Sequence, residues 1–155
     1  MILIPFDRQI IASSLKTDAI KSRLSQVVET SLKWYQHRSE KEFRGQVLEN
    51  GFRIRRNIRG RNSYLPLIKG KLEPTSNGTR IILTFTLHPI VLIVFAAFIV
   101  WAEILAVSIE KSFNFVLLFV FIGFHCLMYV IGYLPEKKKA EEFFEKSLHT
   151  QAEPN

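Results

Sequence analysis

Two long apolar runs constrain this chain more than any other feature. Residues 89–109 read PIVLIVFAAFIVWAEILAVSI, and their only ionisable side chain is Glu103. Residues 113–134 read FNFVLLFVFIGFHCLMYVIGYL and carry no formal charge at neutral pH. As a helix rising ~1.5 Å per residue, each run would cover the ~30 Å hydrocarbon layer of a bilayer. Because three residues separate the runs, the sequence predicts a transmembrane hairpin of two antiparallel helices.

The alternative is a pair of core helices in a soluble protein. Against it, apolar residues surround both runs instead of forming one stripe, and 155 residues leave little chain to cover them. Orientation follows from charge, because Lys and Arg remain on the cytoplasmic side. Residues 1–88 hold sixteen Lys/Arg and seven Asp/Glu, and Lys137–Lys139 follow the second run closely. We therefore expect both termini in the cytoplasm and the link between the runs outside.

The chain before the runs predicts a basic cytoplasmic α+β domain over residues 1–88. Residues 2–11 form a strand candidate, and Pro5 within it favours a sheet edge. Apolar residues at helical spacing predict a helix over 17–36, with Thr17 as its cap. The Asn-Gly pairs at 50–51 and 77–78 are typical of hairpin turns. They predict a four-stranded antiparallel meander with strands at 43–49, 52–58, 64–73 and 79–87.

The two apolar faces of this domain should meet. In the last strand Ile81, Leu83 and Phe85 point to one side, which we expect the 17–36 helix to cover. A C-terminal amphipathic helix from Glu136, within the cytoplasmic tail 135–155, places Ala140, Phe143, Phe144 and Leu148 on one side. That helix either packs on the sheet, which we favour, or lies among lipid headgroups. Pro89 directly follows the last strand, so the sheet should be held against the membrane.

An arginine-rich strand is the most distinctive part of the domain. Within FRIRRNIRGR, Arg53, Arg55, Asn57 and Arg59 would project from one strand face, and Arg61 follows the Gly60 turn. Arginine clasps phosphates and carboxylates with two hydrogen bonds. We predict that Arg53, Arg55, Arg59 and Arg61 bind an anionic partner or lipid headgroups; the alternatives are a solvated face or a phosphorylated ligand. No P-loop, RNP pattern or glycine-rich phosphate turn is present, so we expect no specific nucleic-acid binding.

A catalytic role for Ser63 is the next hypothesis to weigh. A serine nucleophile needs a base within hydrogen-bond reach, and no histidine is linked to Ser63 by sequence. Asn62 and Ser63 more plausibly shape a turn, with Pro66 opening the next strand. We expect no catalytic residue, no cofactor and no metal site. Cys126 is the single cysteine, which excludes a cysteine-based zinc site.

Glu103 and His125 are ionisable residues inside the predicted spans. Such residues are functional candidates by default. If the hairpin folds about residue 111, the two are offset by six residues, ~9 Å along the helix axis, which is too far for a direct pair within one chain. They could instead serve a larger membrane complex. The small residues Ala96, Ala97 and Gly123 would permit close approach of helices in a homo-oligomer.

Several of these segments resemble one family. The segments are F-x-G-x-V at Phe43–Val47, then FRIRR, RNSYLPLIKGK, an Asn-Gly turn and LHPIVL. They resemble small bacterial membrane proteins of the cyanobacterial type, which carry no assigned reaction. The resemblance covers residues 43 to about 101, and its most specific part is an RNS-[YF]-LP motif. It implies a location in the bacterial inner (plasma) membrane, or in the thylakoid membrane of a cyanobacterium.

Together these patterns predict a membrane-apposed binding or scaffold module. Its partners would be the lipid bilayer and either anionic lipids or a membrane protein complex. The alternatives are an accessory subunit of a larger membrane complex and, less favoured, a membrane-anchored enzyme.

Overall fold

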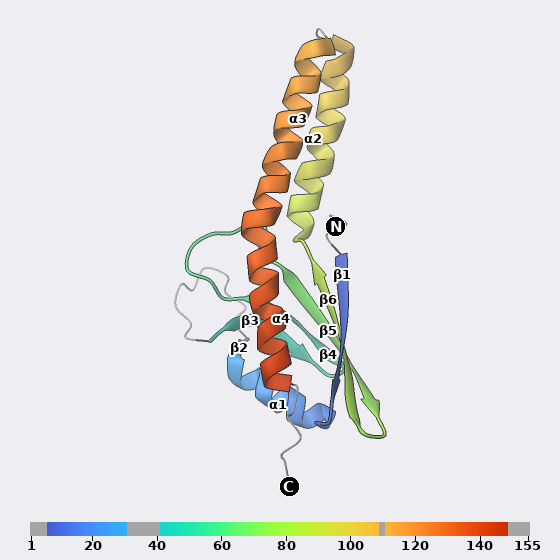
Figure 1. Cartoon of the computed structure of the whole chain (residues 1–155), viewed down its shortest axis with the longest axis vertical. Coiled ribbons are helices and arrows are strands. Elements are labelled where there is room, and N and C mark those ends of the chain that lie inside the picture. The colour runs from blue at the N-terminus through green and yellow to red at the C-terminus, as the bar shows by residue number, and fades with distance from the viewer. Residues whose placement is uncertain (1–5, 31–40, 109–110, 149–155) are drawn as a thin grey trace.

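The structure, a computed structural model of the chain, describes residues 6–30, 41–108 and 111–148. The elements are β1 (Phe6–Ser13), α1 (Thr17–Val27), β2 (Val28–Glu29), β3 (Phe43–Leu48), β4 (Gly51–Arg56), β5 (Leu67–Thr75), β6 (Gly78–Thr86), α2 (Pro89–Ser108), α3 (Lys111–Met128), the π-helical turn η1 (Tyr129–Tyr133) and α4 (Leu134–Leu148). Figure 1 shows α2 and α3 projecting together from one end of an α/β part.

The strands form one six-stranded sheet in the order β1-β6-β5-β4-β3-β2. All neighbours are antiparallel except β2 and β3, so the predicted α+β class is confirmed. The sequence predicted five strands, four in the meander and one at the N-terminus at a sheet edge, and the sheet has a sixth, β2. The N-terminal strand β1 pairs with β6 along its whole length, from Phe6 opposite Thr86 to Ser13 opposite Thr79. The two residues of β2 pair with the start of β3.

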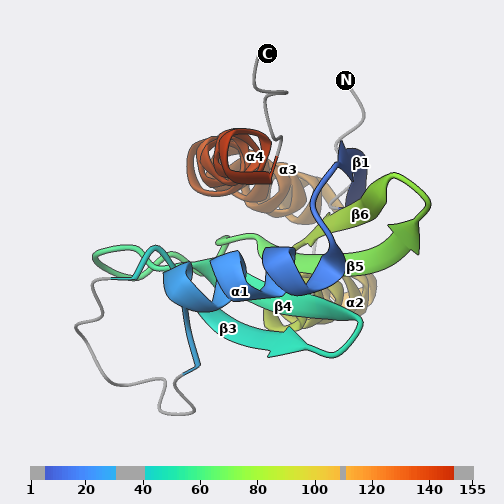
Figure 2. The ribbon, with the colours of Figure 1, turned by 90° about the horizontal axis from the view of Figure 1, so that it is seen from below.

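Two helices cover one face of this sheet. The residues that build the shared core are almost fully buried: Ile20 and Leu24 of α1, Ala140, Phe144 and Leu148 of α4, and Phe43, Phe52, Ile54, Ile68, Ile81, Leu83 and Phe85 of the strands. The Phe144 ring lies 5.5 Å from the Phe52 ring and 5.8 Å from the Phe43 ring. The C-terminal helix therefore packs on the sheet, the alternative that the sequence favoured. Figure 2 shows α1 crossing the sheet beside α4.

The predicted helix over 17–36 is wrong at its C-terminal end. Helix α1 ends at Val27, and Val28 already has an extended backbone. Adjacent β-branched residues favour strand over helix, and Val28 gains a partner in Phe43 of β3. Residues 31–40 lie outside the described part. Thr17 does not cap the helix: Lys16 occupies the cap position, and the Thr17 hydroxyl shares a 3.2 Å hydrogen bond with Thr79.

Helices α2 and α3 lie side by side and run in opposite directions (Figure 1). Their contact is aromatic: the Phe121 ring stacks on Phe98 at 3.4 Å and on Phe95 at 5.8 Å. In the described residues, one helix, Val116–Leu148, is long and apolar enough to cross a membrane, and Pro89–Trp101 forms a shorter apolar helix.

The sequence did not predict that the second apolar helix continues into α4. The π-helical turn η1 joins them, with the Leu134 N–H bonded to the Tyr129 carbonyl. Pro135 follows this turn. Because proline lacks an N–H and clashes with the carbonyl four residues earlier, it disrupts the α-helical hydrogen-bond register at this position. The π-helical turn therefore lets the helix continue instead of breaking after residue 134.

Candidate binding surface

The sheet face turned away from α1 and α4 is basic. Side chains alternate along a strand, so the neighbours of the core residues point to this uncovered face. Its cations are Arg8 of β1, Arg44 of β3, Arg53 and Arg55 of β4, Lys69 and Lys71 of β5 and Arg80 of β6. Two acidic residues of the six strands share this face: Glu73 of β5, and Glu29 of β2, which lies directly opposite Arg44. We call this set the basic face.

The strand register brings the cations close together. One row across the sheet reads Arg8, Thr84, Lys69, Arg53 and Gln46, each residue directly opposite the next. Strands lie ~4.8 Å apart, so the row spans about 19 Å. Arg53 is opposite Lys69, and Arg55 is opposite Arg44. Like charges directly opposite each other destabilise a sheet, so folding stability does not account for this arrangement.

A shallow hollow of about 460 Å³ lies on the basic face between β1, β5 and β6. Arg8, Lys69, Lys71, Glu73, Ile82 and Thr84 line it. The Lys71 Nζ donates a 2.9 Å hydrogen bond to the Glu73 carboxylate, and this bond is the main reason that the pKa of Glu73 is lowered. Across the described ranges Arg8, Lys69 and Arg53 form no salt bridge. The hollow therefore offers cations to an external anion.

The structure forms only part of the strand face on which the sequence placed Arg53, Arg55 and Arg59. Arg53 and Arg55 lie on the basic face, whereas Arg56 points to the covered side and bonds Glu136 of α4 at 2.5 Å. Strand β4 ends at Arg56, so the prediction that Asn57 and Arg59 extend the strand face is wrong. The loop 57–66 carries Arg59 and Arg61, both exposed.

Asn62 fixes this loop to the base of the projecting helices. Its Nδ2 donates a 2.8 Å hydrogen bond to the Gly132 carbonyl in η1, and its Oδ1 accepts one of 2.9 Å from the Tyr64 N–H. A Cβ on Gly132 would come within 3.0 Å of Asn62 and 3.2 Å of Tyr64, so the missing side chain admits the loop. Asn62 therefore makes the turn and also holds its neighbour Arg61 next to η1.

Ser63 and Pro66 have different surroundings in the same loop. Ser63 is exposed and Pro66 is buried directly before β5. Among the residues with described positions, no hydrogen bond joins Ser63 to a histidine or a carboxylate. The same part of the chain contains no group of three His, Cys, Asp or Glu side chains placed to hold a metal ion.

His125 lies in an aromatic environment. Its ring nitrogen Nδ1 is 3.1 Å from the carbonyl oxygen of Phe121, one turn earlier in α3. Its ring centroid is 4.0 Å from Phe121, 5.1 Å from Phe95 and 6.0 Å from Tyr64. These contacts join α2, α3 and the loop 57–66. The side chain of Glu103 lies outside the described part.

Sequence reasoning missed most of the basic face. It found Arg53 and Arg55 because they are close together in one segment, but Arg8, Lys69 and Arg80 come from strands far apart in the chain. The available signal was the alternation of cations with apolar residues in each strand. Their assembly depends on the pairing of β1 with β6.

The chain matches no protein-family model, no curated protein and no solved structure. The family resemblance of its segments therefore stays a prediction, and function has to be argued from the geometry.

Proposed function

We propose that the chain is a two-span membrane protein whose cytoplasmic α+β domain binds an anionic partner through the basic face. The proposal rests on the excess of cations on a sheet face that none of the described helices covers. Such a face is costly to a folded domain unless an anion meets it.

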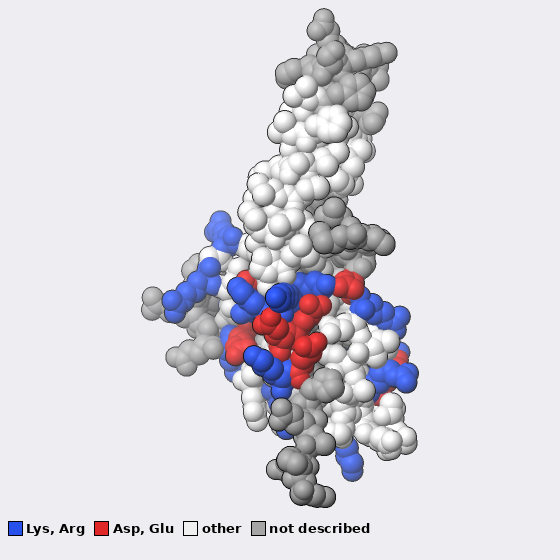
Figure 3. Space-filling view, viewed as in Figure 1, with Lys and Arg blue, Asp and Glu red and all other residues white. Residues whose placement is uncertain are grey.

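The apolar surface of α2 and α3 supports the membrane part of the proposal. Large apolar side chains are exposed along both helices: Ile90, Ile93, Val94, Ile99, Val100, Trp101 and Ile104, and Val116, Phe119, Val120, Ile122, Phe124, Leu127, Val130 and Ile131. A surface of this extent is unfavourable in water. The twenty residues of α2 rise ~30 Å, the thickness of a hydrocarbon core. In Figure 3 the described part of the projecting helices is free of charged side chains on the visible face, and charged side chains of both signs gather around their base.

The domain is attached to the helix pair without a flexible link. Strand β6 leads into α2 through Leu87 and His88, and Val91 on the first turn of α2 belongs to the domain core. Helix α4 continues from α3 and carries Phe144 into the same core. Asn62 adds a third attachment at Gly132. The basic face is therefore held at a fixed distance from the proposed membrane, on the bacterial cytoplasmic side where Lys and Arg remain.

Topology can be tested with single cysteines in a Cys126→Ser background. On intact cells, a membrane-impermeant maleimide should label Ser112→Cys, at the start of α3. Ser14→Cys, in the α/β domain, should react only after the cells are opened. Labelling of both variants on intact cells would contradict the proposed orientation.

Binding can be tested with the full-length protein in nanodiscs of neutral phosphatidylcholine. Fluorescent poly-L-glutamate is the anionic probe, and we expect salt to weaken its binding. Arg53→Ser with Arg55→Ser should lower the affinity at least about tenfold. Lys16→Ser with Lys146→Ser removes the same charge from exposed sites outside the basic face and should have little effect. Equal losses in both double variants would mean that only net charge matters.

A further inference from the structure

Contacts between the strands and α4 indicate how far individual strand residues lie from the proposed membrane. Exposed apolar side chains end at Ile131, and the next charged residue along the helix is Glu136. The membrane boundary therefore falls between these two residues. Arg56 bonds Glu136, only four residues or ~6 Å beyond Gly132. Phe52 stacks on Phe144, ~12 Å deeper on the same helix.

These distances place the C-terminal end of β4, at Arg56, at the depth of the lipid headgroups. The headgroup layer adds ~5–8 Å on each side of the hydrocarbon core. Arg55 is one residue from Arg56 and so lies within ~3.3 Å of it along the strand. Arg61 is next to Asn62, which donates a hydrogen bond to Gly132, and Gly132 lies between Ile131 and Glu136, where the membrane boundary falls. Both arginines thus lie within a side chain's length of the headgroup layer.

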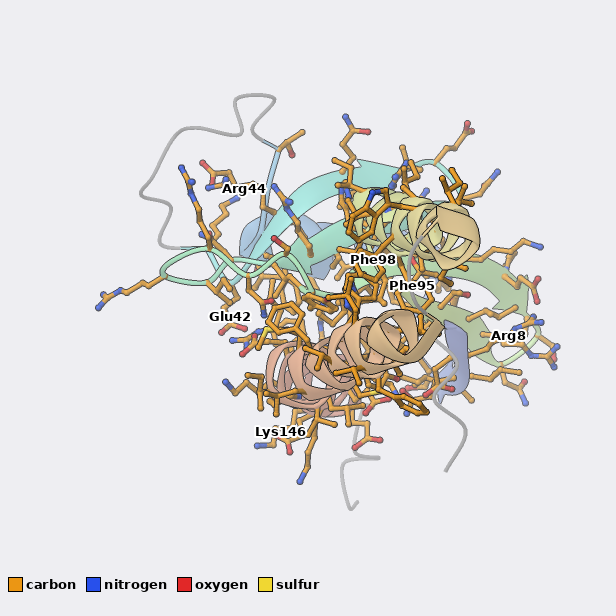
Figure 4. The ribbon with its side chains drawn as sticks, turned by 90° about the horizontal axis from the view of Figure 1, so that it is seen from above. Arg8, Glu42, Arg44, Phe95, Phe98 and Lys146 are labelled. Atoms are coloured by element: carbon orange, nitrogen blue, oxygen red, sulfur yellow. The ribbon has the colours of Figure 1, made fainter. Side chains whose placement is uncertain are left out.

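The basic face also lies on the same side of the sheet as the helix α2. Seen from below, α1 lies in front of β3 and β4, while α2 lies behind them (Figure 2). Seen from above, α2 is nearest the viewer and α1 lies behind the sheet (Figure 4). Helices α1 and α2 therefore lie on opposite sides of β3 and β4, with α2 on the side of the uncovered face (Figure 2 and Figure 4). Figure 4 also shows Arg8 and Arg44 at opposite margins of the sheet.

The chemistry of the face favours lipid over nucleic acid. The aromatic side chains of β3, β4 and β6, namely Phe43, Phe52 and Phe85, are buried on the covered face. They cannot stack on bases, which is how single-stranded nucleic acids are held. Arginine binds phosphate oxygens with two hydrogen bonds. Clusters of basic residues at the cytoplasmic ends of transmembrane helices typically bind the phosphates of lipid headgroups.

We infer that the membrane-proximal part of the basic face, Arg55 together with Arg61, binds the phosphates of anionic phospholipids in the same leaflet. This inference rests on the proposed function and names its ligand. The lipids are held next to the base of α2 and α3, and the rest of the basic face, farther from the helices, extends the positive potential around them. Arg53, one pleat deeper than Arg55, contributes less than Arg55.

The test uses the full-length protein reconstituted in equimolar phosphatidylcholine and phosphatidylglycerol. Lipids that remain bound after gentle detergent release are counted by native mass spectrometry. Wild-type protein should retain phosphatidylglycerol in preference to phosphatidylcholine. Arg55→Ser with Arg61→Ser should reduce this preference by roughly fivefold per residue, the effect of one cation near an anionic surface. Lys16→Ser with Lys146→Ser should retain it.

Two further measurements separate the possible outcomes. Thermal unfolding identifies a double variant that has lost its fold, and high salt applied to wild-type protein should remove the same preference without any substitution. Inorganic phosphate at millimolar concentration should not displace the lipid. An unchanged preference in the Arg55/Arg61 variant would overturn the inference.

The lipid inference and the proposed function can fail separately. If wild-type protein binds poly-L-glutamate but shows no preference for phosphatidylglycerol, the partner is an acidic protein. The lipid inference would then be wrong and the proposed function would stand. Tighter binding of single-stranded DNA than of either probe would indicate a nucleic-acid surface and overturn the lipid inference. If wild-type protein binds none of these anions, both proposals are wrong.

Discussion

The two faces of the sheet differ in how their side chains contribute to the stability of the fold. The covered face is built from side chains that are almost fully buried, such as Phe43, Phe52 and Phe144, whose rings meet at 5.5–5.8 Å. The uncovered face places Arg53 opposite Lys69 and Arg55 opposite Arg44. The first arrangement stabilises the fold, and the second opposes it. The difference separates residues that maintain the structure from residues available for binding.

The largest effect should come from emptying the covered face. Phe144→Ala removes a fully buried ring at the junction of α4, β3 and β4, which should lower the free energy of unfolding by about 3–5 kcal/mol. Proteolysis across a urea series in detergent would measure this loss. Phe119→Ala removes an equal volume from an exposed position on α3, and should leave the domain unchanged. An unchanged free energy of unfolding in Phe144→Ala would contradict the packing of α4 on the sheet.

A smaller effect is expected where the covered face lacks a side chain. Gly70 lies opposite Phe52, and a Cβ at Gly70 would collide with the Phe52 ring. Gly70→Ala should therefore destabilise the domain by about 1–3 kcal/mol in the same urea series. Gly123→Ala is the matched control, because nothing lies within 4 Å of its added methyl group. A neutral Gly70→Ala would mean that the Phe52 ring moves freely.

Neighbouring arginines of β4 should respond in different ways. Arg56→Ala removes the 2.5 Å partner of the Glu136 carboxylate, whose side chain is 13% exposed. Glu136 keeps Lys139 at 2.9 Å, so the loss should be about 1 kcal/mol. Arg55→Ala relieves repulsion with Arg44 and should change stability by less than about 0.5 kcal/mol. Selectivity for phosphatidylglycerol should instead fall in Arg55→Ala and change little in Arg56→Ala. Equal stability losses would remove the distinction between the two faces.

The smallest effect concerns the ion pair between β1 and α4. A hydrogen bond from Lys137 is the main cause that lowers the pKa of Asp7 below its ordinary 3.8. A carboxyl with a lowered pKa stabilises the fold above that ordinary value, and the contribution disappears as pH falls through the folded-state pKa. The Asp7 side chain is 50% exposed, so Asp7→Asn should cost only a few tenths of a kcal/mol at pH 6. The difference between wild-type and variant unfolding temperatures should shrink toward pH 3, and a difference that grows would contradict the assignment.

Local pattern was sufficient for much of the fold. The Asn-Gly turns and alternating strands placed β3–β6 within a few residues, because hairpin turns depend on neighbouring residues. The end of α1 was mispredicted because Val28 gains its partner only when β3 is adjacent. The π-helical turn was also missed, although Pro135 was a visible cause. For the candidate site, local pattern predicted Arg53, Arg55, Arg59 and Arg61, but it placed Arg59 on the strand, which ends at Arg56.

What the sequence determined by itself is the apolar character of α2 and α3, the positive charge of the domain and the hairpin turns, because each depends on residues close together in the chain. What only the tertiary structure decided is which cations share a surface. Arg8 and Arg53 are 45 residues apart and come into one row only because β1 adds to β6. Arg55 and Arg56 are adjacent in sequence, yet the alternation of a strand and the position of α4 send one to the open face and the other to Glu136.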